Sequence, residues 1–273
     1  MQTEPREYYE RHQFLYDHFW SRSALHYGLW SEGVGSLRAA VERTNHVVSQ
    51  QLNITAADQV LDLGSGTGGT AVSIARTTGC RVTGITISPR QQRQATRHAA
   101  DEGLADRVTF VLGDFEKQLP FSDGVFTAVV AIEAFCHAHD KQDVLRELFR
   151  VLAPGGRIAI VDGFLTKEVP MPYEQRIYDV CRKGWQVPSL ATVEGMYGML
   201  RRAGFTESTW DDHTREVIRS SERIRLLGRL SLVPAWLLTV LHISPLLDNS
   251  RCMIEQRRMF DGIARYGIVT AGK

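Results

Sequence analysis

The chain has 273 residues, a formal net charge of +1 and 23% charged side chains. That length is enough for one large α/β domain or for a domain with a small lid. A nucleic-acid substrate would usually require a basic stripe, so this charge balance argues against a nucleic-acid partner. The four cysteines stand alone, without the spacing of a metal site, and predict free thiols in a reducing compartment. The first ten residues are polar and lack the regions of a signal peptide, so we expect a cytoplasmic protein.

The amino-terminal part of the chain is expected to be helical. Residues 5–52 carry aromatic side chains at helical spacing, with a glycine-containing break at 26–30. A second helix is predicted from about residue 36 to residue 52. We therefore expect residues 1–52 to form a helical cap in front of the main domain.

From Gln59 the chain alternates between short apolar runs and helical segments. The predicted strands are 59–63, 81–86, 108–112, 127–132 and 157–162, and the predicted helices between them are 68–78, 89–102 and 142–152. Ser88 and Gln91 have the spacing of a capping box, with Pro89 at the first helical position. Strands that alternate with helices imply right-handed βαβ units and a parallel sheet with both faces covered. Residues 53–165 are the predicted cofactor-binding core.

Beyond residue 163 the alternation is looser. A helix is predicted over 192–203, and two further strands over 205–210 and 263–270. The fold class is therefore α/β, with a Rossmann-like, seven-stranded and mostly parallel sheet. We expect 166–250 to be a lid and substrate region and 251–273 a final helix and strand, all within one domain.

The apolar run 226–247 is almost long enough to span a bilayer. Arg229 and His242 interrupt it, and Pro234 and Pro245 are expected to break its helix. We therefore predict two shorter amphipathic helices that belong to the lid, and no stable membrane span. Contact with a membrane surface is the alternative.

The loop after the first predicted strand is rich in glycine. Gly64, Gly66 and Gly69 have the G-x-G-x-x-G spacing, which alone is equally consistent with a dinucleotide site for nicotinamide or flavin. Asp62 precedes the first glycine, and an acid there suits a ligand with a cationic ammonium better than a pyrophosphate. A second acid, Asp114, follows the third strand, where its carboxylate can accept a hydrogen bond from an exocyclic amine.

Four blocks resemble the class I methyltransferases that depend on S-adenosyl-L-methionine (SAM). They are VLDLGSGTGG (60–69), VTGITIS (82–88), GDFEKQLPF (113–121) and LFRVLAPGGRIAIVD (148–162). Their order and spacing match that family, and the resemblance covers roughly residues 27–162. It implies SAM as the cofactor.

The resemblance also implies which residues bind the cofactor. They are Asp62, Gly64, Ser65, Gly66, Thr67, Thr86, Ile87, Gln91, Gly113, Asp114, Phe115 and Ile132. In this family the turn after the first strand holds the methionine part, and the acid after the third strand binds the adenine amine. Many members have an acid at the end of the second strand for the ribose. This chain has Thr86 there, so Thr86 and Gln91 are expected to share the ribose.

The exit of the fourth strand resembles the I-E-S-x-x-H-x-x-D stretch of small-molecule methyltransferases. Glu133 and His137 are four residues apart and are predicted on one face near the methyl group, with His137 as general base or acceptor-orienting group. A structural or cofactor-capping His137 is the alternative. Asp162 is a candidate assisting acid. A metal on His137, His139 and Asp140 is an alternative that we do not adopt, so no metal is expected.

The two ends of the chain resemble tocopherol-type and sterol-type C-methyltransferases. The similarity lies in HYGLW (26–30), whose Tyr27 and Trp30 are candidate substrate contacts or plain core aromatics, and in the tail from Met253 to Thr270. These families, like the related sugar O-methyltransferases, imply methyl transfer to carbon or oxygen of a small, largely apolar natural product of terpenoid, quinol or polyketide type.

Other functions and assemblies remain open from the sequence. An N-methyltransferase of a small molecule, a non-catalytic SAM-binding protein, and an RNA or protein methyltransferase are the alternatives, and the absence of a basic stripe disfavours RNA. A homodimer is open as the assembly. The shared fold by itself cannot name the acceptor.

Overall fold

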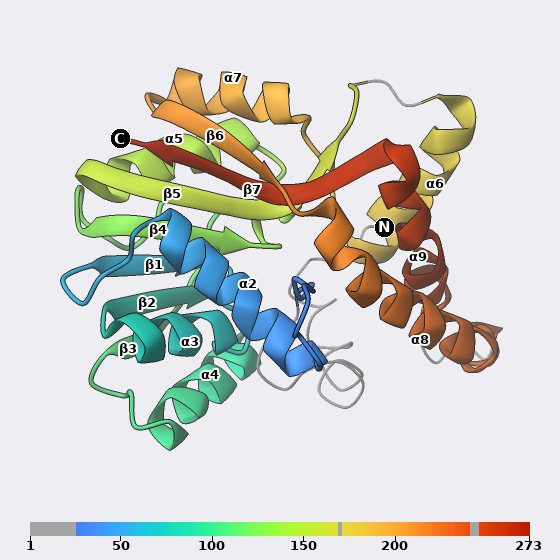
Figure 1. Cartoon of the computed structure of the whole chain (residues 1–273), viewed down its shortest axis with the longest axis horizontal. Helices are drawn as coiled ribbons and strands as arrows, with labels where there is room; N and C mark the ends of the chain where they lie inside the picture. Colours follow the sequence, from blue (N-terminus) through green and yellow to red (C-terminus); the bar gives the residue numbers. More distant parts are fainter. Residues whose placement is uncertain (1–25, 169–170, 241–245) are drawn as a thin grey trace.

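The computed structural model describes residues 26–168, 171–240 and 246–273. Its centre is one seven-stranded sheet in the order β3-β2-β1-β4-β5-β7-β6 (Figure 1). The strands are β1 (Gln59–Leu63), β2 (Arg81–Thr86), β3 (Val108–Leu112), β4 (Phe126–Ile132), β5 (Leu152–Leu165), β6 (Thr206–Asp212) and β7 (Ala264–Gly272). Only β7 runs antiparallel to its neighbours β5 and β6. The predicted fold class is confirmed.

The helices form a layer on each face of the sheet and a third group beyond the ends of its strands. Their bounds are α2 (Leu37–Gln51), α3 (Gly69–Thr78), α4 (Pro89–Asp101), α5 (Lys141–Val151), α6 (Pro172–Trp185), α7 (Val193–Ala203), α8 (Thr214–Val240) and α9 (Leu246–Arg258). In Figure 1, α2, α3 and α4 lie on one side of the sheet and α5 and α7 on the other, while α6, α8 and α9 stand together at its end. Short helical turns follow β4 (Phe135–His137) and α9 (Met259–Ile263).

Two apolar clusters, one on each face, hold the sheet between its helices. Leu61 and Val129 pack with α5 and α7, whereas the alternate residues Val60 and Val130 pack with α2, α3 and α4. All four side chains are fully buried. Burial on both faces explains why the strands are continuous apolar runs, and each such side chain contributes about 1.5–3 kcal/mol.

Helix starts follow the local capping chemistry. Ser36 accepts a hydrogen bond from the Ala39 N–H and begins α2, and Ser88 accepts from the Gln91 N–H and begins α4. Pro89 occupies the first turn of α4, where a missing N–H costs nothing. These starts agree with the predicted ones.

The predicted break at Pro234 is wrong, because α8 continues through it as one 27-residue helix. Its long packing contact with α9 provides tertiary support for a helix that propensity alone would interrupt. The predicted break at Pro245 falls outside the described residues, as does any helix before residue 26. Among the described helices, none is both long and apolar enough to cross a membrane.

Two elements differ from prediction in length or existence. Helix α6 was not predicted, although Pro172 in its first turn and Glu174, whose carboxylate accepts from the Met171 N–H, are helix-start signals. Strand β5 runs from Leu152 to Leu165, beyond the predicted 157–162 at both ends, and its part from Arg157 to Leu165 pairs with β7. Asp162 therefore lies inside the strand and not at its end.

Candidate active site

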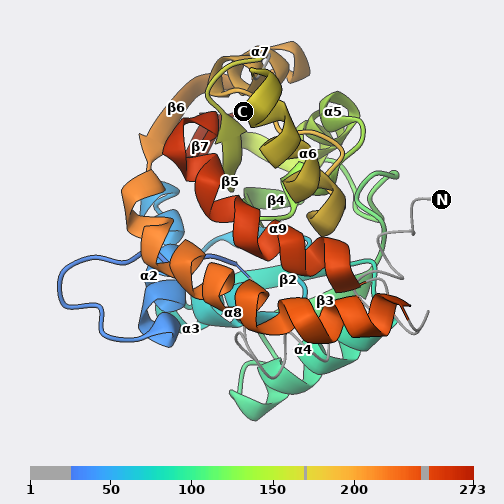
Figure 2. The same ribbon diagram turned by 90° about the vertical axis from the view of Figure 1, so that its right-hand side faces the viewer.

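Residues predicted for the site gather where the parallel strands end. The carboxyl ends of β1, β2, β4 and β5 meet at the edge of the sheet that faces α6, α8 and α9 (Figure 2). In open parallel sheets ligands bind at this edge, because the loops that leave the strands surround a crevice there. Figure 2 shows these three helices in front of the strand ends.

The turn after β1 has a backbone that requires glycine. Gly64 and Gly66 have φ angles of +71° and +52°, and Gly68, which precedes α3, has +85°. A Cβ on Gly64 would stand 2.6 Å from the Cβ of Ala134, so the turn passes close to the loop after β4. No side chain caps α3 at Gly68, so its first N–H groups have no capping side chain among the described residues. Such a terminus favours an anionic group such as a carboxylate.

Asp62 is a buried carboxylate beside this turn. Its side chain is 2% exposed, and its Oδ2 has no hydrogen-bond partner among the described residues. Burial raises the pKa of Asp62 to about 7, and a hydrogen bond from the Ala71 backbone opposes that rise only in part. A buried acceptor without a donor is costly, and a cationic ammonium placed there would satisfy it. The residues present therefore fit the ammonium and carboxylate of an amino-acid group.

Ser65 and Thr67, the other turn residues, are buried in the loop. The Ser65 N–H donates to the carbonyl of Ile85 at 2.9 Å, which ties the turn to β2. Ile132, the last residue of β4, is also buried and stands next to Glu133 in the chain. The structure thus brings the predicted methionine-binding residues onto adjacent strand ends.

The predicted ribose pair is in contact. Thr86 at the end of β2 donates its hydroxyl to Gln91 Oε1 at 2.9 Å, and both side chains are buried. The Ser88 N–H lies 3.3 Å from the Thr86 hydroxyl, so this end of β2 is held by polar contacts without an acid. Ile87, between them, is only partly buried.

The predicted adenine residues lie on the loop after β3. Asp114 Oδ1 accepts from the Glu116 N–H at 3.0 Å, and its Oδ2 is 3.7 Å from Lys117 Nζ. A Cβ on Gly113 would stand 2.7 Å from Ile85, so glycine allows the loop to approach β2. Phe115 is partly buried against the apolar cluster of the α5 face, and its ring comes within 3.7 Å of a Cβ built on Gly64.

Glu133 is the most constrained acid of the site. Its φ of +48° is unusual for a residue with a side chain. Its Oε1 accepts two hydrogen bonds of 2.7 Å, from the Tyr27 N–H and from the Tyr266 hydroxyl. Burial raises the pKa of Glu133 to about 8, although both hydrogen bonds lower it. A carboxyl group with a pKa near neutrality can hold or accept a proton, which is a property of catalytic groups.

A chain of polar contacts connects Glu133 to α8 and α9. The Tyr27 hydroxyl donates to Gln256 Oε1 of α9 at 2.6 Å, and the Ser221 hydroxyl of α8 donates to the same oxygen at 2.8 Å. Sequence reasoning missed Gln256, Ser221 and Tyr266. Tyr266 was within the tail that resembles C-methyltransferases, and that resemblance was the only signal for it.

His137 lies on the turn after β4 and is partly buried. Its Nδ1 is 3.4 Å from the carbonyl oxygen of Gln186, which follows α6. Burial lowers the pKa of His137 to about 4, so the imidazole is neutral near pH 7. A neutral imidazole can orient a hydroxyl or accept a proton transiently, but it is a weak base at this pKa.

Two buried charged groups brace the turn that carries His137. Asp162 Oδ2 accepts from the Cys136 N–H at 2.9 Å, and burial raises the pKa of Asp162 to about 6. Lys141 Nζ donates to the carbonyls of Cys136 and Ala138 at 3.2 and 2.8 Å. Lys141 was not predicted from the sequence. The contacts of Asp162 are those of a positioning group.

Tyr27 and Trp30, the two aromatic residues predicted to contact the substrate, lie in different surroundings. Tyr27 packs edge-on against Tyr266, with ring centroids 5.5 Å apart, and so lies next to Glu133. Trp30 donates its indole N–H to Ser220 Oγ at 2.8 Å, and Arg219 stands 4.0 Å over its ring. Trp30 therefore anchors the start of α8.

Two residues of the alternative metal site, His139 and Asp140, make other contacts. The ring Nδ1 of His139 is 2.9 Å from Glu116 Oε1, and Asp140 caps α5. Within the described ranges, no group of three or more His, Cys, Asp or Glu residues is arranged to hold a metal ion.

The sheet order, the glycine turn and the buried acid before it are features of the class I methyltransferases that the sequence resembles. Comparisons with known proteins agree. Residues 61–160 match the family model described as a methyltransferase domain. Sterol 24-C-methyltransferase of Eremothecium gossypii is 35% identical over 201 residues, which cover 72% of this chain and 53% of that protein. Methyltransferase GfsG of Streptomyces halstedii is 41% identical over 140 residues, half of each chain.

The fold is also similar to the solved structure of the [4+2]-cyclase SpnF. The TM-score is 0.82 and the identity 25%, over 98% of this chain and 95% of that one. The chain is similar to the class I SAM-dependent methyltransferases, and several of the curated relatives that it matches are sterol 24-C-methyltransferases. The predicted resemblance is confirmed, and SAM is the cofactor of this family. The chain spans about half the length of the sterol methyltransferases that it matches.

Proposed function

We propose that this protein transfers a methyl group from SAM to carbon or oxygen of a small, largely apolar acceptor. The observation that carries the proposal is the buried Asp62 carboxylate, whose Oδ2 has no described partner, beside a turn that only glycine can form. The turn from Gly64 to Thr67 and the start of α3 would hold the methionine part. Thr86 and Gln91 would hold the ribose, and Asp114 and Phe115 the adenine.

When bound, the cofactor supplies a methyl group that is already activated on a sulfonium. The protein therefore has mainly to align the acceptor and exclude water. Glu133 is suited to take a proton from the acceptor, because its pKa of about 8 leaves a proton-accepting fraction at neutral pH. Tyr266 and the Tyr27 N–H hold the carboxylate in one orientation, and His137 would orient the acceptor from the turn braced by Asp162 and Lys141.

The surroundings of the carboxyl ends of the parallel strands support an apolar acceptor. Helices α6 and α9 at this end of the sheet share an apolar cluster that includes Tyr178, Cys181 and Cys252. One of the named relatives is a sterol 24-C-methyltransferase, and a sterol is a largely apolar molecule. We propose that the described part of residues 166–250 forms the lid and substrate region of a single domain.

The similarity to a [4+2]-cyclase supports a second candidate, a pericyclic ring closure without methyl transfer on the same fold. The two candidates differ in whether methyl groups are consumed. Incubation with SAM labelled in its methyl group, together with a panel of sterols, prenylated quinols and polyketides, tests this difference.

Label in an extracted product, with a mass gain of one methylene, supports the methyltransferase. Cofactor binding without label transfer to any acceptor would contradict it and would favour the second candidate or a non-catalytic binding protein. NMR of the isolated product then identifies the methylated atom as carbon, oxygen or nitrogen.

A further inference from the structure

One face of α8 exposes a row of apolar side chains. Leu226, Leu230 and Val233 are 57%, 68% and 72% exposed, and they follow one another at intervals of four and three residues. Trp236, three residues further, is 55% exposed. Residues three and four apart lie on one side of a helix, so these four form a single strip, the α8 strip. These four are half of the large exposed apolar side chains in the described ranges, so exposed apolar side chains are concentrated on this one helix.

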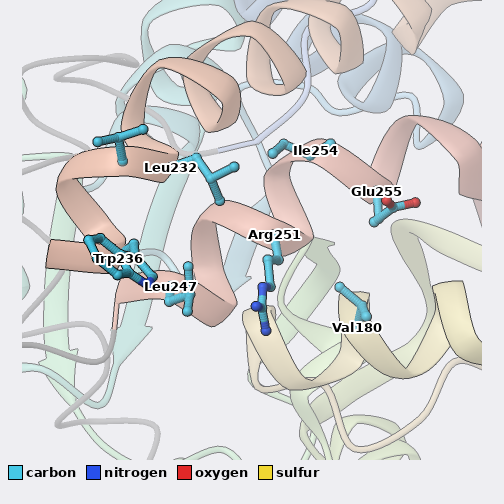
Figure 3. Close-up of a pocket in the computed structure, with 8 residues that line it drawn as sticks. Val180, Leu232, Trp236, Leu247, Arg251, Ile254 and Glu255 are labelled. Atoms are coloured by element: carbon cyan, nitrogen blue, oxygen red, sulfur yellow. The ribbon is translucent and has the colours of Figure 1, made fainter. Parts of the chain in front are cut away.

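The α8 strip borders a cavity. A pocket of about 480 Å³ opens between α6, α8 and α9 (Figure 3). Its lining residues are Val180, Leu232, Val233, Trp236, Leu247, Arg251, Ile254 and Glu255. Val233 and Trp236 belong both to the exposed strip and to the cavity wall. The apolar surface is therefore continuous from the outside of α8 into a space of the size that holds small ligands.

Cationic side chains flank the α8 strip. Arg223 and Arg229 are exposed, and each is three residues from Leu226, so both neighbour it on the helix. Neither has an ion-pair partner in the described part of the chain, and the same holds for the exposed Arg251 of the cavity wall.

Carboxylates near this surface are already paired. Glu222 binds Arg225 and Arg257, and Glu255 binds Arg258. The surroundings of the α8 strip therefore present an excess of positive charge next to exposed apolar area.

We propose that the α8 strip docks on the surface of an anionic lipid membrane. Exposed apolar side chains next to arginines form the arrangement of an interfacial helix, which inserts its apolar side among lipid chains while its cations bind anionic headgroups. The described part of α8 does not meet the requirement for a span, so it lies on the surface. The cavity then opens toward the membrane, and an apolar acceptor can enter without crossing water. This last consequence rests on the proposed function.

A second copy of the chain fits the same surface less well. Two strips packed against each other would bring Arg223 and Arg229 of both copies together without a described carboxylate to balance them. Like charges at an interface are unfavourable, whereas anionic headgroups neutralise them.

Flotation with vesicles tests the docking site. The full chain is mixed with vesicles of phosphatidylcholine alone or with 30% phosphatidylglycerol, and bound protein is measured at rising lipid concentration. We expect at least fivefold tighter binding to the anionic vesicles. Leu226→Glu with Leu230→Glu, which change the strip without touching the cavity wall, should reduce binding to them at least tenfold. Arg223→Gln with Arg229→Gln should remove the preference for anionic lipid.

Val125→Glu is the matched control, because Val125 is 43% exposed but precedes β4 at the opposite edge of the sheet. It should bind as the unchanged protein does. Thermal melts confirm that each variant is folded. The proposal is overturned if the unchanged protein does not float with anionic vesicles, or if the strip variants bind as well as the control. A third outcome would also overturn it. In that outcome light scattering shows a dimer that is lost only in the strip variants, and neither the unchanged protein nor any variant binds vesicles.

A separate measurement distinguishes this proposal from the proposed function. Cofactor binding by calorimetry and methyl transfer to an acceptor delivered by cyclodextrin do not require a membrane, so the strip variants should keep both. If vesicle binding is found but no methyl transfer, the docking site stands and the proposed function fails. If methyl transfer is found without vesicle binding, the reverse holds.

Discussion

The hydroxyl of Tyr266 donates a hydrogen bond of 2.7 Å to Glu133, although 133 residues separate them in the chain. Glu133 directly follows β4, and Tyr266 lies in the antiparallel strand β7. The bond lowers the pKa of Glu133, which burial otherwise raises. The proton affinity of Glu133 therefore depends on a residue near the carboxyl terminus.

Tyr266→Phe removes this donor and should raise the pKa of Glu133 further. If deprotonated Glu133 accepts a proton, activity rises with pH through about 8, and the midpoint in the variant should move to higher pH. We expect kcat at pH 7 to fall by about 10- to 100-fold. Initial rates between pH 6 and 10 measure both effects. Tyr197→Phe on α7 is the control, and an unchanged profile in the Tyr266 variant would exclude this role.

Asp62→Asn should weaken cofactor binding at least ~100-fold, because the amide cannot neutralise an ammonium. The same change should stabilise the cofactor-free protein above pH 7 by about 1–3 kcal/mol, because it removes a buried charge without a partner. The pKa of Asp62 is raised to about 7 in the folded state, so its ionisation lowers the stability of the free protein as pH rises from about 4 to about 7, and the loss then levels off.

Calorimetry and thermal melts over this pH range test the prediction for Asp62. Cofactor affinity in the unchanged protein should fall below pH 7, where the acid must lose its proton to bind. Asp106→Asn, whose side chain is 74% exposed, should change neither quantity. A variant that binds the cofactor normally would remove Asp62 from the site.

His137→Ala should reduce kcat by about 100-fold if the imidazole accepts a proton or orients the acceptor, with little change in cofactor affinity. Since burial lowers the pKa of His137 to about 4, its ionisation should not appear in rate profiles above pH 5. His139→Ala, on the exposed side of the same loop, is the matched control. Near-full activity of the His137 variant would assign the residue to structure alone.

Arg157→Met should destabilise the fold by about 2–4 kcal/mol, because it leaves the buried carboxylate of Asp58 without its cation. Burial would raise the pKa of Asp58, but hydrogen bonds from Arg157, Thr127 and Thr55 outweigh it and hold the pKa well below its usual range. This group therefore adds stability above pH 4 and loses it as pH falls further.

Urea unfolding at pH 7 and at pH 3 measures the free energy of unfolding of the unchanged protein and of the Arg157→Met variant. The variant should lose less stability on acidification than the unchanged protein. Arg146→Met is the control, since its pair with Asp143 is exposed and such pairs contribute about 0–1 kcal/mol. If Arg157→Met and Arg146→Met lowered the free energy of unfolding at pH 7 by the same amount, this would contradict the role of Arg157 as the stabilising partner of Asp58.

Local chemistry explains what the sequence predicted correctly. The runs around Val60 and Val130 are apolar because both faces of the sheet are covered, and Ser36 and Ser88 begin helices by capping them. The glycine turn and Asp62 are adjacent in the chain, so their joint meaning is visible without a structure.

Relationships over long distances could not be predicted in this way. No local period links Tyr266 to Glu133, or Gln256 to Tyr27, because only the sheet order brings them together. Pro234 was expected to end a helix, and the packing of α8 against α9 is invisible to a local pattern.

The position of β7 between β5 and β6 has a consequence for synthesis. Ribosomes release a chain from its amino terminus, so β6 emerges before the strand that joins it to the sheet. Until Ala264–Gly272 follows, β5 has an open edge and Glu133 lacks the phenol that Tyr266 provides. An open edge invites pairing with other chains. Nascent chains stalled before this strand should therefore aggregate and be inactive, even with every cofactor-binding residue already made.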